Sequence, residues 1–154
     1  MKKILIAVDN TKGSQTAVTV FEDLFSCSRP ETVVLVYVER FSGTSFLDDM
    51  ITDAEMKTLK EVLIGTEYQE AVDKKAANIT GSFKKTLEDK GVTGIKTVVR
   101  EGHPAEEILK AAKEENADMI IMGSRGKRAH HSITLGSISR EVVNNAEIPV
   151  LIAK

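Results

Sequence analysis

The residues best suited to chemistry lie between Gly123 and Ser137, where glycines recur in the spacing G-x2-G-x9-G-S. Gly123 and Gly126 open this segment, and Gly136 stands directly before the final serine, at the start of a helical pattern. Glycine lets a backbone adopt positive φ and approach a ligand closely, while the first amides of a helix are unpaired donors at its positive end. The combination predicts a phosphate-binding loop. Spacing alone fits an ordinary turn between a strand and a helix equally well.

The same segment carries a dense group of basic and imidazole side chains, namely Arg125, Lys127, Arg128, His130 and His131. Two interpretations stay open for them. They contact phosphates directly, with Arg125 as our candidate, or they form a hydrated cationic loop, as most exposed charges do. A metal site at the two histidines is disfavoured, because adjacent side chains diverge and no partner carboxylate is evident. We therefore assign no metal ligand.

Motifs of other nucleotide-binding and hydrolytic classes are absent from the sequence. It contains neither the G-x-x-x-x-G-K-[ST] of P-loop ATPases, nor G-x-G-x-x-G after the first predicted strand, nor a G-x-S-x-G nucleophile elbow. Glu141 would repel phosphate, and no strong base for activating water can be named. We predict that Cys27 is a buried, inert thiol and that His103 caps a helix or lies in a loop. Rapid hydrolysis is not expected, and no catalytic residue is assigned.

The elements that must position this loop follow from hydrophobic periodicity. Aliphatic runs predict strands covered on both faces at residues 3–8, 32–38, 95–99, 118–122 and 149–153. Helical spacing predicts helices at about residues 11–25, 56–90, 104–116 and 136–145, with a loop at residues 39–51. Gly65 and Gly81 are possible breaks in the second helix. The alternation predicts a parallel α/β sheet with helices on both faces, in which ligands bind beyond the carboxyl ends of strands.

The composition is that of a single soluble domain spanning residues 1–154. Of the 154 residues, 42% are hydrophobic and 29% charged, and no apolar run reaches the length of a signal or membrane-spanning segment. The single cysteine rules out an internal disulfide and suits a reducing compartment, so a cytoplasmic location is expected. With a net charge of −2, the chain lacks the positive electrostatic field that attracts nucleic acid. Neither nucleic-acid binding nor membrane association is expected.

The sequence resembles the universal stress protein family, in its ATP-binding branch. The resemblance rests on the G-x2-G-x9-G-S/T loop and on segments from the whole chain: KKILIAVD, VVLVYV, EGHPAEEIL, ADMIIMGSRG and IPVLIAK. Residues 10–13 (NTKG) depart from the more usual Asp-x-Ser opening of the family. The resemblance implies an open five-stranded parallel sheet in the order 3-2-1-4-5, the Rossmann-like adenine nucleotide alpha hydrolase-like fold. Asp9 and Gly123 are then neighbours at its switch point.

The resemblance also implies a ligand, ATP or its relatives ADP and AMP together with Mg²⁺, and it assigns residues to that ligand. Asp9 matches a ribose acceptor, since a carboxylate can accept two hydroxyl hydrogen bonds. Ala7 and Val38 match the adenine pocket, where a backbone amide and carbonyl can read the base edge. Met122 and Gly123 match residues beside the adenosine. The implied phosphate cradle consists of Gly126, Gly136, Ser137 and Ile138.

We expect a cytoplasmic, homodimeric binding module that senses or stores adenine nucleotide and passes that state to partner proteins. If residues 149–153 form an edge strand, their aliphatic row needs a cover, and in the family this strand pairs with its symmetry mate. The alternative is a slow ATPase or self-phosphorylating enzyme that uses Ser132 or Ser137. A response-regulator-like phosphoacceptor ranks below both, because it needs an aspartate after the third strand, where Glu101 stands.

Overall fold

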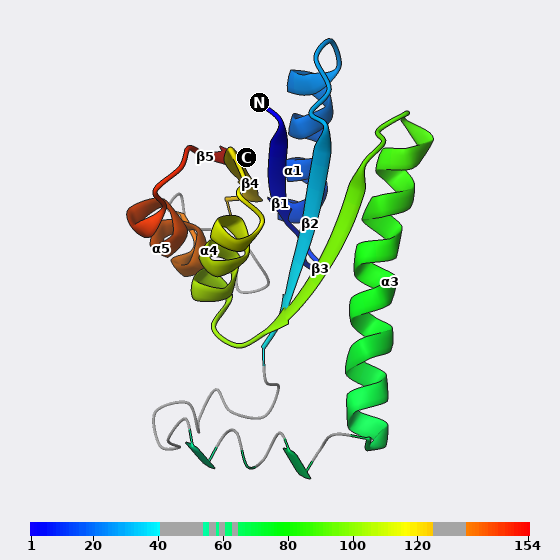
Figure 1. The fold of residues 1–154 in the computed structure, drawn as a ribbon, viewed down its shortest axis with the longest axis vertical. Helices are drawn as coiled ribbons and strands as arrows, with labels where there is room; N and C mark the ends of the chain where they lie inside the picture. Colours follow the sequence, from blue (N-terminus) through cyan, green and yellow to red (C-terminus); the bar gives the residue numbers. More distant parts are fainter. Residues whose placement is uncertain (41–53, 56–57, 59–60, 63–64, 125–134) are drawn as a thin grey trace.

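The computed structural model describes residues 1–40, 54–55, 58, 61–62, 65–124 and 135–154. Five parallel strands form one sheet in the order β3-β2-β1-β4-β5 (Figure 1). The strands are β1 (Lys3–Ala7), β2 (Thr32–Glu39), β3 (Ile95–Glu101), β4 (Met119–Gly123) and β5 (Val150–Ala153). The helices between them are α1 (Lys12–Phe25), α3 (Glu67–Asp89), α4 (Pro104–Glu114) and α5 (Ser137–Asn145). The predicted fold class and strand order are confirmed.

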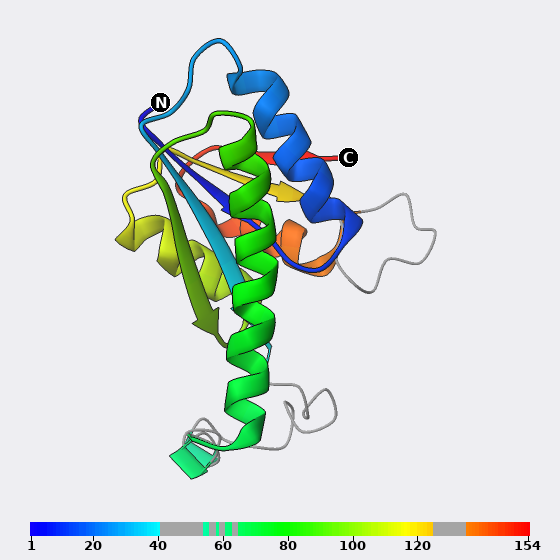
Figure 2. The same ribbon diagram turned by 90° about the vertical axis from the view of Figure 1, so that its right-hand side faces the viewer.

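Helices cover both faces of the sheet (Figures 1 and 2). Side chains alternate between the two faces of a strand, so β1 sends Ile4 and Ile6 toward α1 and α3, and Leu5 and Ala7 toward α4 and α5. Each face has its own apolar cluster. This double burial is the physical reason why the central strands consist of unbroken aliphatic runs rather than alternating polar and apolar residues.

The element boundaries differ from the predicted ones at several places. β2 continues to Glu39, one residue into the predicted loop, because the buried carboxylate of Glu39 finds partners inside the structure. The predicted helix over residues 56–90 is divided at Gly65, which has a φ of +81°, and α3 starts only after Thr66. Gly81 lies inside α3 and does not break it. Residues 56, 59 and 63 of the predicted apolar stripe lie outside the described residues.

The prediction of a buried thiol at Cys27 is wrong. α1 ends at Phe25, and Cys27 lies in the turn beyond it with an exposed side chain. Because the chain leaves the helix before this position, the apolar stripe of α1 does not extend to it. In the described part of the chain, no helix is long and apolar enough to cross a membrane.

The strand order reverses between the central strand β1 and its neighbour β4. Their register pairs Ile4 with Met119 and Ile6 with Ile121, so the two strands end side by side. The chain leaves β1 into α1 on one face of the sheet and leaves β4 toward α5 on the other. The connections therefore diverge at the carboxyl ends of β1 and β4, which is where open α/β sheets bind ligands.

Candidate functional site

Asp9 follows β1 directly, and its carboxylate is held by two hydroxyl groups of the next turn. Ser14 Oγ donates to Asp9 Oδ1 at 2.7 Å, and Thr11 Oγ1 donates to the same oxygen. The Asp9 amide in turn donates to Ser14 Oγ at 2.7 Å. Both bonds to the carboxylate use Oδ1, so Asp9 Oδ2 has no hydrogen-bond donor among the described residues.

The backbone of Val38 is turned toward the space beyond the end of β1. The Val8 amide donates to the Val36 carbonyl at 2.8 Å, so the backbone groups of Val36 point toward β1. Backbone groups of alternate residues point the same way along a strand, so those of Val38 share this direction. The β1–β2 register ends at the pair Ala7–Val36. Val38 therefore presents an amide and a carbonyl on the side where Asp9 lies.

Four of the residues matched to the adenosine and phosphate sites share one apolar cluster, between the sheet and the α4–α5 layer. Ala7 and Met122 are buried members of this cluster, and Val38 and Ile138 pack against it. These residues come from β1, β4, β2 and α5 respectively. The fold thus brings together residues that are far apart in the sequence, at the carboxyl ends of three strands and the start of a helix.

Gly123 is a glycine for a reason that the sequence did not reveal. A Cβ atom at this position would lie 2.5 Å from the carbonyl carbon and 2.6 Å from the carbonyl oxygen of Gly13, in the first turn of α1. Positive φ, which we expected of the loop glycines, is not the reason at Gly123 or at Gly136, whose φ is −60°. The glycine at position 123 lets the start of α1 pack directly on the end of β4.

The start of α5 is anchored to the end of β4 and has no side-chain cap. The Gly136 amide donates to the Ser124 carbonyl at 2.9 Å, and Ser139 Oγ donates to the Gly123 carbonyl at 2.9 Å. The N-cap residue is Gly136, which has no side chain to cap the first amides of the helix, and no acidic residue lies in the first turn. The exposed Ser137 follows. Unpaired amides at a helix start attract anions.

His103 and Glu141 meet between the starts of α4 and α5. His103 Nδ1 lies 3.6 Å from Glu141 Oε1, a separation that makes an ion pair when the imidazole is protonated. His103 is the N-cap residue of α4, as expected of a capping or loop residue, although its side chain makes no capping hydrogen bond. The partner of Glu141 is thus an imidazole, a pairing that sequence reasoning missed.

Two of the candidate nucleotide contacts, Arg125 and Gly126, lie outside the described residues, as does the remainder of the basic cluster at 127–131. Within the described ranges, no group of three or more His, Cys, Asp or Glu side chains is arranged to hold a metal ion.

Sequence reasoning also missed a polar cluster at the end of β2. Lys75 Nζ donates to Glu39 Oε1 at 2.7 Å and to Oε2 at 3.0 Å, and Tyr37 Oη donates to Glu39 Oε2. Burial, followed by the hydrogen bond to Glu39, raises the pKa of Tyr37 to about 12. The hydrogen bond to Glu39 also raises the pKa of Lys75. The sequence offered one signal for this cluster: the acidic residue Glu39 directly follows the predicted buried strand at residues 32–38.

Comparison with known proteins agrees with this architecture. The chain matches the model of the universal stress protein family over residues 1–154. It is 31% identical to universal stress protein MJ0577 of Methanocaldococcus jannaschii, over 99% of this chain and 94% of the relative. The solved structure of MJ0577 superposes with a TM-score of 0.77 over 99% of this chain and 95% of that chain.

Two more distant solved structures hold adenine nucleotides. One is a universal stress protein in complex with cAMP, with 19% identity, a TM-score of 0.67, and coverage of 99% of this chain and 97% of that chain. The other is an Arabidopsis thaliana universal stress protein family protein with AMP bound, with 17% identity, a TM-score of 0.63, and coverage of 100% and 92%. At these identities the likeness shows the fold alone. Because the family model matches residues 1–154, the chain belongs to the universal stress protein family.

Proposed function

We propose that this chain is a regulatory module that binds ATP, or ADP or AMP, at the carboxyl ends of β1 and β4. The observation that carries the proposal is the arrangement of Asp9, whose Oδ1 is occupied by Thr11 and Ser14 while Oδ2 accepts no bond from a described residue. A carboxylate oriented in this way can accept both ribose hydroxyls through its open oxygen and its remaining lone pairs.

The neighbouring groups fit the other parts of a nucleotide. The Val38 amide and carbonyl form a donor and an acceptor on one edge, which suits the base edge of adenine. Ala7, Met122 and Ile138 supply apolar surface for the purine ring. The amides at the start of α5 and the Ser137 hydroxyl can donate hydrogen bonds to the phosphates. We propose that Gly126 and Arg125 contact the phosphates as well. The cAMP and AMP complexes of related folds support adenine as the base.

Mg²⁺ would accompany a bound triphosphate. The oxygen ligands that Mg²⁺ prefers are present in Ser137 and Asp9, but they do not form a cage by themselves, so phosphate oxygens and water would supply the remaining ligands. The ion would neutralise phosphate charge there. We propose a cytoplasmic location for the module, in keeping with its single cysteine.

The test is a calorimetric titration with ATP and GTP. A base edge read by fixed backbone groups leaves mismatched donors unpaired with guanine, at a cost of about 1–3 kcal/mol, so we expect ATP to bind about ten- to a hundredfold more tightly. Mass spectrometry of the denatured protein should identify the resident nucleotide. Equal affinities for ATP and GTP would refute the adenine pocket, and no binding of either would refute the site.

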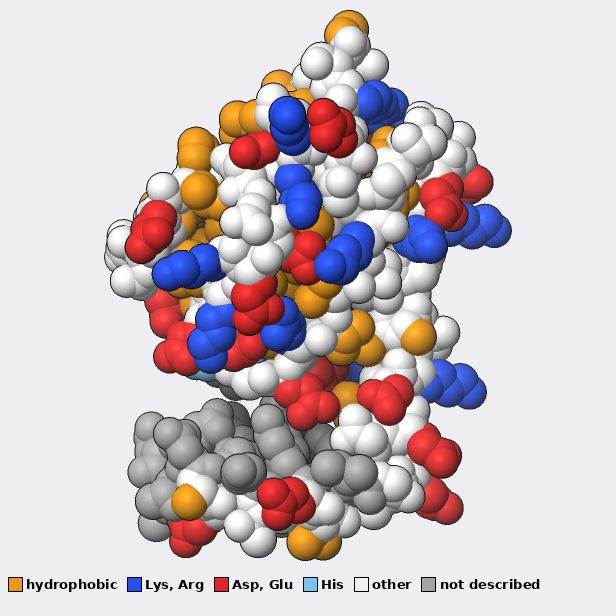
Figure 3. Space-filling model, viewed as in Figure 1, with side chains coloured by type: hydrophobic (Ala, Val, Ile, Leu, Met, Phe, Trp, Pro, Cys, Tyr) orange, Lys and Arg blue, Asp and Glu red, His pale blue; other side chains and the backbone are white. Residues whose placement is uncertain are grey.

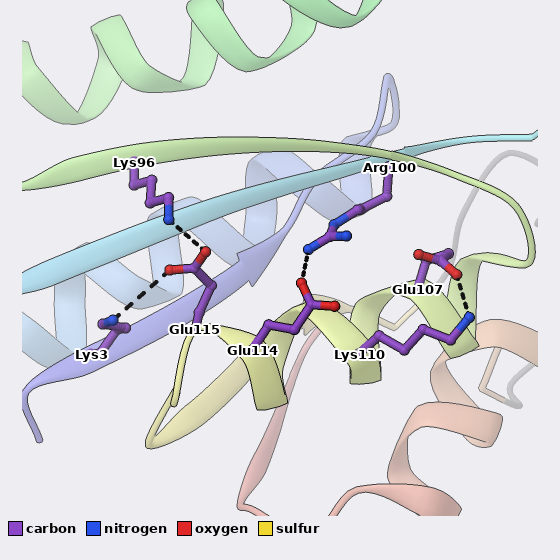
Figure 4. A network of polar contacts seen from close by, with 7 residues as sticks. All are labelled: Lys3, Lys96, Arg100, Glu107, Lys110, Glu114 and Glu115. Carbon is purple, nitrogen blue, oxygen red and sulfur yellow. Dashed lines mark hydrogen bonds and ion pairs between the residues drawn. The ribbon is translucent and has the colours of Figure 1, made fainter.

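We also propose a homodimer through β5, because the two edges of the sheet differ. At the β3 edge, Lys96 and Arg100 pair with Glu115 and Glu114 of the α4 end (Figure 4). Acidic and basic side chains are interspersed over the face shown in Figure 3. The β5 edge instead carries the half-buried aliphatic residues Val150, Leu151 and Ile152. An uncharged edge strand readily pairs with another strand.

Leu151→Asp tests the dimer, because it places a charge in the middle of the proposed pairing. We expect light scattering to give the mass of a monomer for this variant and of a dimer for the wild type. Thr97→Asp, on the exposed part of β3, is the matched control and should leave the dimer intact. A dimeric, folded Leu151→Asp protein would place the interface elsewhere.

A further inference from the structure

The polar cluster at the end of β2, formed by Tyr37, Glu39 and Lys75, is the most deeply buried group of ionisable side chains outside the nucleotide site in the described chain. Tyr37 is 2% exposed and Glu39 is 4% exposed. Both side chains lie on the face of β2 that α3 covers, and Lys75 reaches them from α3. Lys75 lies in the part of α3 that precedes its apolar contacts Ala76, Ile79, Phe83 and Leu87.

The surroundings of Tyr37 and Lys75 favour the protonated form of each side chain. Burial and the bond to Glu39 raise the pKa of Tyr37 to about 12, so the phenol keeps its proton and donates it to the carboxylate. The pKa of Lys75 is also raised, chiefly by its hydrogen bond to Glu39. Both groups therefore keep the protons with which they donate to Glu39.

Stability alone does not account for this cluster. The Glu39 carboxylate is buried, whereas the Lys75 side chain is 41% exposed. Desolvating the carboxylate offsets much of its attraction to the ammonium, so the pair adds little to stability. The α3 side chains that pack into the core against the sheet are apolar. A hydrogen-bonded pair with a buried carboxylate can serve instead to select one conformation, as hydrogen bonds and charge are more directional than apolar contacts.

The residue that the cluster brackets is Val38. Its sequence neighbours on both sides, Tyr37 and Glu39, are bonded to each other through their side chains, and Lys75 binds Glu39 through both carboxylate oxygens. The Glu39 carbonyl also accepts from the Gly102 amide at 3.2 Å, in the turn between β3 and α4. Glu39 is thus tied to α3 by its side chain and to the β3–α4 turn by its backbone, while the Val38 backbone faces the opposite side.

We propose that Lys75 is a positioning residue for base recognition. Acting through Glu39 and Tyr37, it fixes the last residues of β2 so that the amide and carbonyl of Val38 meet the edge of adenine. This inference rests on the proposed adenine pocket. Its consequence is specific: loss of Lys75 should reduce discrimination between bases, because the reading groups are displaced, rather than reduce binding of the triphosphate as such.

The experiment measures ATP and GTP affinities of full-length variants by calorimetry. Lys75→Met removes the ammonium and keeps the length of the side chain. Glu39→Leu/Lys75→Met removes the whole pair, so no uncompensated buried charge threatens the fold. Lys84→Met is the matched control, because Lys84 lies on the same helix and pairs only with the exposed Glu88, at 3.7 Å, among the described residues.

We expect the ATP-to-GTP preference of about ten- to a hundredfold to fall to about twofold or less in both Lys75 variants, and to persist in Lys84→Met. ATP and GTP carry the same phosphates, so the loss of a positive charge by itself would weaken both equally and leave the ratio unchanged. If a folded double variant keeps the wild-type ratio, the positioning role is refuted. If the wild type shows no preference, the adenine pocket itself fails, which is a distinct result.

Discussion

α4 and α5 lie on the same face of the sheet, yet the first turns of the two helices differ in charge and capping. α4 begins with Pro104, which has no amide hydrogen to satisfy, and carries Glu106 and Glu107 in its first turn. α5 begins after Gly136, with no acidic residue in its first turn and no capping side chain. The positive end of α4 is thus neutralised from within the chain, whereas the first turn of α5 contains no acidic residue to do so.

This difference is the reason why we propose the start of α5, and not that of α4, as the phosphate site. Both helices follow the carboxyl end of a strand, where α/β sheets bind ligands, so position alone does not distinguish them. Local charge and capping do distinguish them. The His103–Glu141 contact lies between the two starts and adds an acid on the second turn of α5, away from its first amides.

The largest effect is expected from giving α5 the internal cap that it lacks. Gly136→Asp fits the extended backbone at this position (φ −60°, ψ 156°), and its carboxylate would accept from the first amides while repelling phosphate. We expect ATP affinity to fall at least about a hundredfold. The free energy of unfolding should change by only a few tenths of a kcal/mol, since glycine and aspartate differ little as N-caps.

Gly136→Asn is its matched control, because it offers a similar cap without the charge. ATP binding should weaken less in this variant than in Gly136→Asp. Undiminished ATP binding by a folded Gly136→Asp protein would show that phosphate does not use the start of α5.

A smaller loss is expected from Ser137→Ala, which removes one hydroxyl donor and leaves the helix amides free. A hydrogen bond to a charged group contributes roughly 1.5–3 kcal/mol, so ATP affinity should fall about ten- to a hundredfold. Calorimetry gives the affinity and circular dichroism checks the fold. Ser139→Ala is not a suitable control, because Ser139 bonds to Gly123 and anchors the helix. An unchanged affinity would limit the contact to backbone amides.

The smallest effect is expected at α4, where Glu106→Gln removes a charge that complements the helix dipole. We expect a loss of about 0.3–1 kcal/mol in the free energy of unfolding, reduced in high salt, and no change in ATP affinity. Urea unfolding at low and high ionic strength measures the first quantity, and calorimetry the second. A change in ATP affinity of tenfold would mean that α4 also faces the ligand, and the contrast with α5 would be lost.

Much of the fold and part of the site follow from the sequence alone. The unbroken aliphatic runs that became β1, β2 and β4 predict strands buried on both faces, because only such strands exclude polar residues. Alternation with helices then predicts a parallel sheet. The boundaries were less certain: the division at Gly65 and the extension of β2 to Glu39 depend on neighbours that local propensity does not contain.

The class of fold, the family and the glycine pattern could be predicted from the residues alone, since these depend on periodicity and spacing along the chain. Three contacts could not be predicted in this way: the packing of Gly123 against the backbone of Gly13, the Lys75–Glu39 bond and the His103–Glu141 pair. Each of these contacts joins residues from different elements. Their meeting depends on how the sheet is ordered and how the helices pack on it, which no local pattern of residues encodes.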